Sequence, residues 1–384
     1  MKFKTYKIKD LINEISMGPF GSNIKVECFV DSGIPVLNGS NLTGFALNDN
    51  SFRYVTPEKA DSLGKANAYR GDIVITHRGT LGQIVFIPKN SKHSRYVISQ
   101  SQFRVKCNEK ILPEYLVYYF HTNAGQHKLL SNASQVGVPA LARASTTFQT
   151  LEIDIPDVTE QRKIVDLFET IREKIELNNA INNNLEQQVS ILYQSWFEDF
   201  EITNGVCPED WSYQELSSIA DIASGKRPPV KSNVCNQETP VSIVGAASVM
   251  GFTSEANHTD KILVTGRVGT HGVVQRFNTP CWTSDNTLVI TSPYYEFTNQ
   301  ILHRIDYSSM NRGSTQPLIT QGDMKKVVVL VPDENTVAKF EEFAGSLMVK
   351  WEANNKENVK LASLRDTLLP KLMSGELDVS NIEI

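Results

Sequence analysis

The chain has 384 residues, of which 40% are hydrophobic and 21% are charged, and its formal net charge is −5. This length allows two or three domains with separate cores, and the composition is ordinary for a soluble globular protein. The five cysteines include no CxxC pair, so we expect neither disulfides nor a zinc ribbon, and we expect a cytoplasmic protein. The start MKFKTYKIKDL lacks the apolar core of a signal peptide, and the longest aliphatic run is too short to cross a membrane.

Charge is unevenly distributed along the chain. Residues 1–156 carry 18 basic and 12 acidic side chains, whereas residues 157–200 carry 4 and 9. Such segregation can place a basic face on a phosphate backbone and an acidic face towards a protein partner. Residues 201–332 are close to neutral, so the electrostatic argument is weaker there.

The first predicted domain, residues 1–156, is mixed α/β with mainly β character. Its elements are expected in this order: an amphipathic segment with a glycine-rich turn (11–21), a strand (34–37), a strand closing on a glycine turn (72–82), a helix (113–130) and a last strand (151–155). No segment is biased enough in composition to predict disorder.

A long helix is predicted next, over residues 157–200. Side chains recur along it at alternating steps of four and three, which makes a heptad seam. The seam consists of Ile164, Phe168, Ile171, Ile175, Asn178, Asn182, Leu185, Val189, Leu192 and Trp196. Pro156 ends the preceding strand, and Asp157 and Glu160 have the spacing of a capping box.

The same plan then repeats. Residues 151–197 match residues 327–373 at a constant offset of 176, with ten identities in 47 positions. The repeat predicts a second mixed domain over 201–332 and a second long helix over 333–373, followed by a tail over 374–384. In the second domain we expect strands at 241–244, 261–272 and 327–331 and a helix at 299–308. Pro370 and Gly375 are expected to stop the second helix.

Two asparagines lie at the centre of each seam, Asn178 and Asn182 in the first and Asn354 and Asn358 in the second. Buried asparagine costs stability and is tolerated where it fixes register. If the helices pack antiparallel, Asn178 and Asn182 face Asn358 and Asn354. The alternative is that these side chains lie on a wet stretch of a surface helix.

Motifs for catalysis are missing from the sequence. We find no P-loop, HExxH or GxSxG string, and no glycine-rich cofactor turn with the Pro-Pro motif of an amino-methyltransferase. The seven histidines do not cluster at metal-ligand spacing. The sequence therefore predicts a chain without catalytic residues, cofactor or metal.

The two glycine turns are better candidates, for binding DNA. They share Arg, then Gly-Thr-x-Gly, which we align as Arg78 with Arg267 and Gly79–Gly82 with Gly269–Gly272. Arginine can fork onto guanine or phosphate, and glycine-rich backbone approaches phosphates closely. The DNA-contact candidates are Lys25, Arg78, Thr80, Lys226, Arg227, Lys231, Arg267, Thr270, His271, Arg312, Thr315 and Gln316. The alternative is that these are tight hairpin turns and solvated lysines, with arginines that only form salt bridges.

At this point the sequence resembles the specificity subunits of type I restriction-modification enzymes. The resemblance covers essentially the whole chain. It is carried by the doubled layout and by the strings IPDVTEQRKIV (155–165), LYQSWF (192–197), GSTQP (313–317) and LRDTLLPKLMSGEL (364–377).

The resemblance implies two target recognition domains, 1–156 and 201–332, held apart by two long antiparallel helices that form a coiled coil. Each domain would read one half of a bipartite, asymmetric site on double-stranded DNA. The helices would dock two methyltransferase (modification) subunits and, through them, two restriction (motor-nuclease) subunits, to which S-adenosylmethionine, ATP and magnesium would belong. Two alternatives remain: a fused two-domain methyltransferase or nuclease, and a scaffold that binds proteins only. No short motif in the sequence identifies the DNA site or its spacer, because base readout depends on the geometry of the loops.

Overall fold

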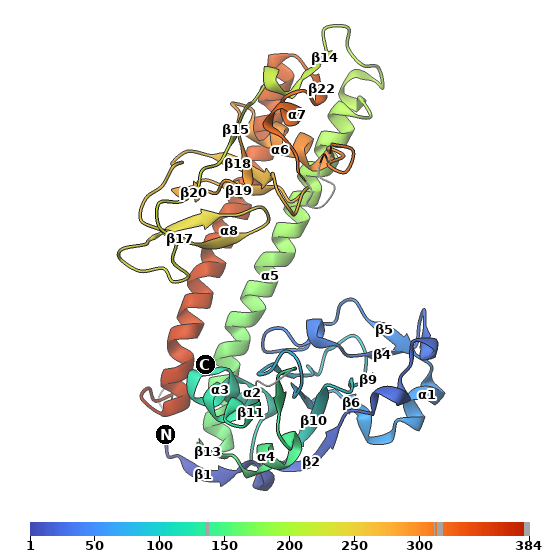
Figure 1. Ribbon diagram of the computed structural model, residues 1–384, viewed down its shortest axis with the longest axis vertical. Coiled ribbons are helices and arrows are strands. Elements are labelled where there is room, and N and C mark those ends of the chain that lie inside the picture. Colours follow the sequence, from blue (N-terminus) through green and yellow to red (C-terminus); the bar gives the residue numbers. More distant parts are fainter. Residues whose placement is uncertain (135–137, 311, 313–317, 380–384) are drawn as a thin grey trace. The chain divides into compact units, whose positions relative to one another are not determined.

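The structure is a computed structural model that describes residues 1–134, 138–310, 312 and 318–379. It divides into two compact units (Figure 1): unit 1 comprises residues 1–176 and 357–384, and unit 2 comprises residues 177–356. Two long helices, α5 (Val158–Phe197) and α8 (Glu334–Ser374), each pass from one unit into the other. Each unit therefore holds the beginning of one long helix and the end of the other.

Unit 1 is built on two sheets. The central antiparallel sheet has the order β2 (Ile12–Met17), β10 (Gln102–Cys107), β7 (Ile73–Thr76), β8 (Ile84–Phe86). The second sheet has the order β3 (Phe29–Val30), β5 (Arg53–Val55), β4 (Ile34–Val36), β9 (Arg95–Val97), β6 (Asn67–Tyr69), with β4 and β9 parallel. Two small sheets pair β1 (Lys4–Lys7) with β13 (Glu152–Ile155) and β11 (Ala133–Ser134) with β12 (Ala140–Leu141). The helices are α1 (Pro57–Ser62), α2 (Pro113–His121), α3 (Asn123–Leu130) and α4 (Ala144–Thr150).

Strand β7 shows why unit 1 needs two cores. Ile73 and Ile75 point into the core that also holds α2 and the long helices, whereas Val74 points into the core under the second sheet. All three are fully buried. Because each fully buried aliphatic side chain contributes about 1.5–3 kcal/mol, a strand apolar on both faces is stable only between two layers.

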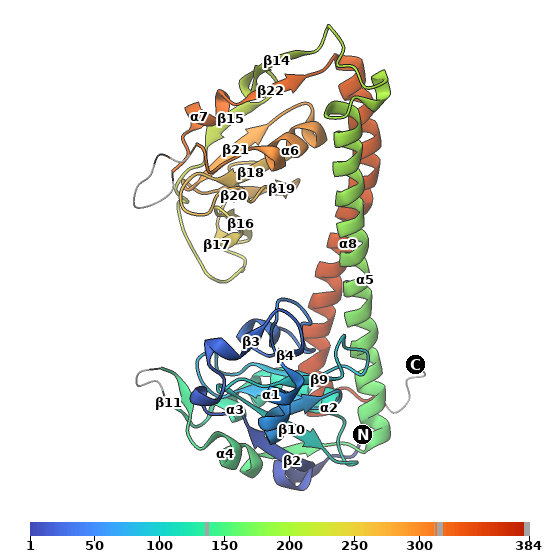
Figure 2. The ribbon, with the colours of Figure 1, turned by 90° about the vertical axis from the view of Figure 1, so that its right-hand side faces the viewer.

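Unit 2 repeats this plan with fewer elements. Its central sheet has the order β15 (Asp221–Ser224), β21 (Thr287–Thr291), β18 (Ile262–Gly266), β19 (Gln275–Phe277). The second sheet has the order β17 (Val249–Thr253), β16 (Val241–Val244), β20 (Cys281–Thr283), with β16 and β20 parallel. Strand β14 (Ser212–Glu215) pairs with β22 (Val328–Val331), and the helices are α6 (Tyr295–Arg304) and α7 (Gln321–Lys325). Figure 2 shows α6 between the central sheet and the long helices, where Phe297 and Leu302 are buried.

The long helices are antiparallel in both units. In unit 1 the start of α5 shares a core with the end of α8, through Ile164, Phe168 and Leu372, and Lys174 Nζ lies 3.3 Å from Glu357 Oε2. In unit 2 the end of α5 packs on the start of α8, where the rings of Tyr193 and Phe340 lie 5.9 Å apart. The predicted mixed α/β fold with an antiparallel pair of long helices is therefore confirmed. None of the described helices has an apolar run suited to crossing a bilayer.

The helix ends agree in part with the sequence. Asp157 Oδ1 accepts the backbone N–H of Glu160 at 3.0 Å, and Asp333 Oδ1 accepts that of Thr336 at 3.0 Å, so both long helices have an aspartate N-cap. Helix α8 ends before Gly375, whose φ is +78°. The prediction that Pro370 stops the helix is wrong, because α8 continues to Ser374.

Packing explains this and two further departures. Leu369, Leu372 and Met373 are buried in the core of unit 1, which holds the last turn helical despite the proline. The helix expected over 113–130 is two helices that meet at Thr122, whose hydroxyl accepts the N–H of Gly125. Arg365 on α8 stands where the offset of 176 places the apolar Val189 of the first seam, and its guanidinium carbon lies 5.2 Å from the ring centre of Phe45.

Candidate nucleic-acid interface

The two predicted glycine turns have the same backbone. Between β7 and β8, Gly79 and Gly82 have φ of +89° and +86°. Between β18 and β19, Gly269 and Gly272 have φ of +86° and +78°. Positive φ strains any residue with a side chain, so glycine is needed at these four positions. The alignment of the glycines made from sequence is supported by this geometry.

The alignment of the arginines is wrong by one residue. His77 N–H donates to Ser101 O at 2.9 Å, and Arg267 N–H makes the equivalent bond to Asn286 O at 2.8 Å. The carbonyl of His77 accepts from Leu141, just as that of Arg267 accepts from Ile319. Arg267 is thus the counterpart of His77, and the residue at the position of Arg78 in unit 2 is Val268. The short strings look alike, but strand pairing sets the register.

Arg78 and Thr80 both lie exposed on the first turn. The Thr80 hydroxyl donates to Gln83 Oε1 at 2.7 Å, and Gln83 Nε2 donates to Gly39 O at 3.0 Å. These bonds hold the turn against the loop that contains Gly39. Within the part of the chain that the structure describes, the Arg78 side chain has neither an ion pair nor a hydrogen bond. It is therefore available to an anion or a base edge.

In the second turn Arg267 is half-buried and Thr270 is exposed. The Nε of Arg267 is buried and has no hydrogen-bond partner among the described residues. His271 Nδ1 lies 3.2 Å from Gly266 O, while its Nε2 is buried and also lacks a partner in that part of the chain. This turn therefore offers fewer free groups to solvent than the turn of unit 1.

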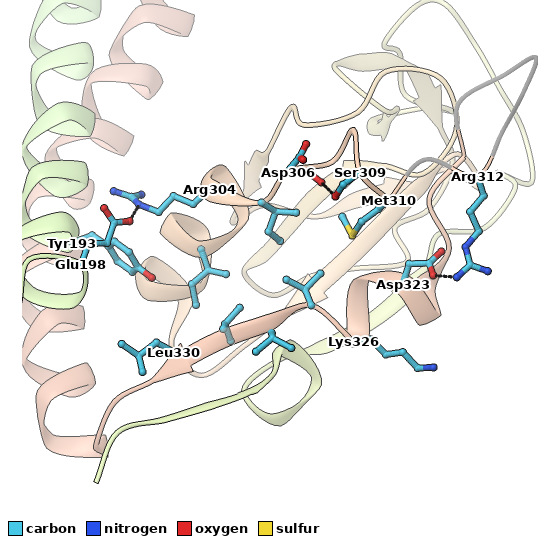
Figure 3. A pocket seen from close by; sticks show the side chains of 15 residues that line it. Tyr193, Glu198, Arg304, Asp306, Ser309, Met310, Arg312, Asp323, Lys326 and Leu330 are labelled. Carbon is cyan, nitrogen blue, oxygen red and sulfur yellow. Dashed lines mark hydrogen bonds and ion pairs between the residues drawn. The ribbon is translucent and has the colours of Figure 1, made fainter. Parts of the chain in front are cut away.

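The basic segment of unit 2 lies beyond the end of β15. Lys226, Arg227 and Lys231 are exposed, and the indole of Trp282 donates to the carbonyl of Lys226 at 2.7 Å. Lys25 in unit 1 is exposed as well. Arg312 differs because it forms an ion pair with Asp323 (Figure 3). Thr315 and Gln316 lie outside the described residues.

Arg312 helps to line a hollow of about 660 Å³, whose lining side chains are drawn in Figure 3. Its other charged groups include Glu198, Arg304 and Asp306. The Thr320 hydroxyl donates to Asp323, which lowers the pKa of that carboxyl and keeps it ionised. Because acidic and basic side chains are mixed in the lining, this hollow is poorly suited to a polyanion.

Sequence reasoning missed a second hollow, of about 580 Å³, beside the first turn. Lys65, His77, Arg78 and Gln100 contribute to its lining. His77 Nε2 lies 3.1 Å from Gln100 O, and burial lowers the pKa of His77, so a neutral ring donates to this carbonyl. No string in the sequence signals this group, because its members come from three separate loops.

No group of three or more His, Cys, Asp or Glu side chains within the described ranges could hold a metal ion.

The comparisons with known proteins agree on one family. Residues 2–187 match the model of the type I restriction modification DNA specificity domain. The MjaIX specificity subunit of Methanocaldococcus jannaschii is 24% identical, covering 98% of this chain and 94% of that protein. The HindI specificity subunit of Haemophilus influenzae is 23% identical, covering 87% of this chain and 93% of that protein. Over most of its length the chain is therefore similar to the specificity subunits of type I restriction enzymes.

A solved specificity subunit has the same fold. The crystal structure of the S subunit from M. genitalium superposes with a TM-score of 0.59 at 16% identity, and the match covers 97% of this chain and 96% of that one. The likeness extends over both β-rich domains and the long helices.

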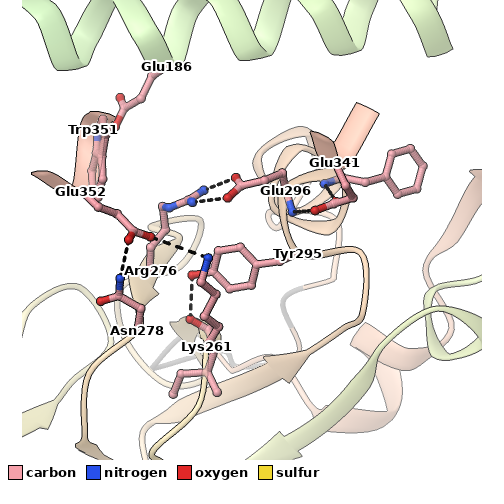
Figure 4. A network of polar contacts seen from close by, with 11 residues as sticks. Glu186, Lys261, Arg276, Asn278, Tyr295, Glu296, Glu341, Trp351 and Glu352 are labelled. Atoms are coloured by element: carbon pink, nitrogen blue, oxygen red, sulfur yellow. Dashed lines mark hydrogen bonds and ion pairs between the residues drawn. The ribbon is translucent and has the colours of Figure 1, made fainter. Parts of the chain in front are cut away.

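In unit 2 a buried polar network joins the β-rich part to α8 (Figure 4). Arg276 forms two hydrogen bonds to Glu296, of 2.7 and 2.6 Å, and its guanidinium lies over the rings of Tyr295 and Trp351. Glu341 of α8 accepts the backbone N–H groups of Glu296 and Phe297 at 3.1 and 2.7 Å. Burial raises the pKa of Glu341 to about 7. The network fixes how the sheet of unit 2 sits on α8.

Proposed function

We propose that this chain is the non-catalytic subunit that selects the DNA sequence for a type I restriction-modification complex. It reads a bipartite, asymmetric site on double-stranded DNA, one half with residues 1–156 and the other with residues 201–332. The observation that carries the proposal is the pair of glycine turns, which have one backbone and different side chains. Two domains whose turns share one backbone but carry different side chains suit a site whose halves differ in sequence.

In this proposal the reading groups work in two ways. Exposed arginines and lysines, chiefly Arg78, Lys226 and Arg227, contact phosphates or guanine edges. Thr80, Thr270 and His271 contribute shorter polar contacts from the turns. Lys25, Lys231, Arg267 and Arg312, together with Thr315 and Gln316, complete the proposed DNA-contact set.

The long helices, residues 157–200 and 333–373, have a second role in the proposal. They dock two methyltransferase subunits and, through these, two restriction subunits, which supply the chemistry. Asn354 donates to Asn182 Oδ1 at 2.8 Å, and Asn182 donates to Asn355 Oδ1 at 3.1 Å. We propose that these amides fix the register of the helix pair, because a slipped register would leave them unpaired in an apolar seam. The pairing of Asn178 with Asn358 stays a prediction.

The test is an exchange of residues 201–332 for the same segment of a relative. The sequence selected by the complex from a random duplex library should change in one half-site only. Binding to the methyltransferase subunit, measured without DNA, should be unchanged. If the exchange alters both half-sites, or abolishes assembly while the chimera is folded, the proposed division of labour is wrong. A chain that selects no duplex but binds methyltransferase would instead be a protein scaffold.

A further inference from the structure

One loop position is equivalent in the two units although the sequences there are unrelated. Gly18 N–H donates to Gln102 O at 2.8 Å at the end of β2, and Gly225 N–H donates to Thr287 O at 3.1 Å at the end of β15. A β-carbon on Gly18 would lie 1.9 Å from Ser99 O, and one on Gly225 would lie 2.1 Å from Ser284 O. Both glycines are therefore required by the same close approach of backbone to backbone.

The residues two places after these glycines are Phe20 and Arg227. Arg227 belongs to the basic segment proposed to contact DNA. Its counterpart Phe20 is 83% exposed, the largest exposed fraction of any large apolar side chain among the described residues. An isolated apolar side chain on a surface is ordinary. This one stands on a loop whose base is pinned by Gly18, so it is held out into solvent on a fixed support.

The charged side chains that line the hollow around Phe20, Lys65 and Arg78, are basic. Phe20 lines the hollow of about 580 Å³ together with Lys65, His77, Arg78 and Gln100. No Asp or Glu is among the described residues that line it, whereas four other hollows in the protein each include at least one carboxylate. An exposed aromatic ring beside two cations, with no acid in the same lining, is complementary to a nucleic acid and not to a basic partner.

We propose that Phe20 contacts the bases of the half-site read by unit 1, packing its ring against a base step as an apolar wedge. In this arrangement Lys65 and Arg78 hold the adjacent phosphates. The two units then use one loop position in different ways, with a ring in unit 1 and a cation in unit 2. The inference rests on the proposed function, since it assumes that the chain reads duplex DNA.

The experiment compares Phe20→Ala with Arg227→Ala in the full chain with its methyltransferase subunit. The probe is the duplex that the wild-type complex selects from a random library. Phe20→Ala should weaken binding about tenfold or more, the size of an aromatic contact to one base. It should relax base preference in one half-site and leave the salt dependence unchanged. Arg227→Ala should instead lower the slope of log K against log salt by about 0.9, because one phosphate contact is lost.

Two further variants make the result specific. Phe20→Trp keeps a ring and should retain most of the affinity, which a contribution to folding alone would not explain. Tyr213→Ala removes a 73% exposed ring on β14 of unit 2, outside the loop position shared by Phe20 and Arg227, and should leave base preference unchanged.

The outcomes separate the two proposals. If the wild type selects a duplex and Phe20→Ala binds it with unchanged affinity and preference, Phe20 is not a reading residue. If Phe20→Ala weakens both half-sites equally, the wedge is also ruled out. If the wild type selects no duplex at all, the proposed function fails and this inference fails with it.

Discussion

The glycine turn of unit 1 presents Arg78 to solvent, whereas in unit 2 the same backbone position holds Val268 and the arginine stands one residue earlier. Nearby, Phe86 on β8 and Arg276 on β19 are counterparts, because Ile73 pairs with Phe86 as Leu263 pairs with Arg276. One is an apolar core residue, and the other is half of a buried ion pair. The two units thus keep one backbone plan while exchanging apolar for charged chemistry at matched positions. Conservation of a turn therefore does not imply conservation of the side chains that it displays.

The largest expected effect comes from the ion pair that unit 1 lacks. Glu296→Ala leaves Arg276 buried without its partner and should lower the free energy of unfolding of unit 2 by about 3–5 kcal/mol. Replacing both residues by apolar ones, Arg276→Met with Glu296→Leu, should cost far less, because the counterpart Phe86 is already apolar. Thermal or denaturant unfolding measures both. A double variant as unstable as the single one would show that the pair itself is needed.

The close approach of backbone at Gly18 and Gly225 is common to both units, so substitution of either glycine should cost a similar amount of stability. Gly18→Ala and Gly225→Ala each force a β-carbon against a carbonyl oxygen, and overpacking of this kind costs about 1–3 kcal/mol. Gly345→Ala is the control, since a β-carbon there meets nothing within 4 Å and the residue lies within α8. Melting temperatures of the three variants test this. Unequal losses at Gly18 and Gly225 would mean that the two loops are not equivalent.

The two turn arginines, Arg78 and Arg267, should differ in how their loss affects DNA binding and stability. Arg78→Ala should cost about 1–3 kcal/mol of DNA binding and relax one half-site if Arg78 reads a base. If it contacts phosphate, binding should weaken evenly across sequences and the salt slope should fall. Arg267→Ala should act more on the stability of unit 2, because its half-buried side chain loses packing contacts there. DNA binding is measured by gel shift, and stability is measured by unfolding of the free protein. If both variants weakened DNA binding equally and neither lost stability, the proposed difference between Arg78 and Arg267 would be wrong.

The last expected effect is on pH dependence, and it belongs to unit 2. Burial raises the pKa of Glu341 to about 7 from the 4.5 of an unperturbed carboxyl. The native state therefore binds this proton more tightly than the unfolded state. The stabilisation that the protonated Glu341 carboxyl gives the native state is full below pH 4.5 and is lost as pH rises towards 7. Glu341→Gln should flatten the decrease of unit 2 stability over that window, and an unchanged slope would assign the decrease to other groups.

Sequence reasoning predicted the features that are periodic or local. The heptad spacing and its repeat indicated both long helices, and Asp157 marked the N-cap of the first. It was wrong where distant packing prevails, as at Pro370, where the buried side chains of the last turn keep α8 helical. It also treated Arg78 and Arg267 as equivalents because the strings resemble one another.

What the sequence by itself determined is the doubled plan: two divergent domains, each followed by a long helix, with matched asparagines in the two seams. These follow from spacing along the chain, which constrains a helix directly. Only the tertiary structure decided which residues occupy the same place in the two domains. Phe20 with Arg227, His77 with Arg267 and Phe86 with Arg276 are counterparts because of backbone hydrogen bonds between strands far apart in sequence. Such pairings are set by the register of the whole sheet, and no local string encodes them.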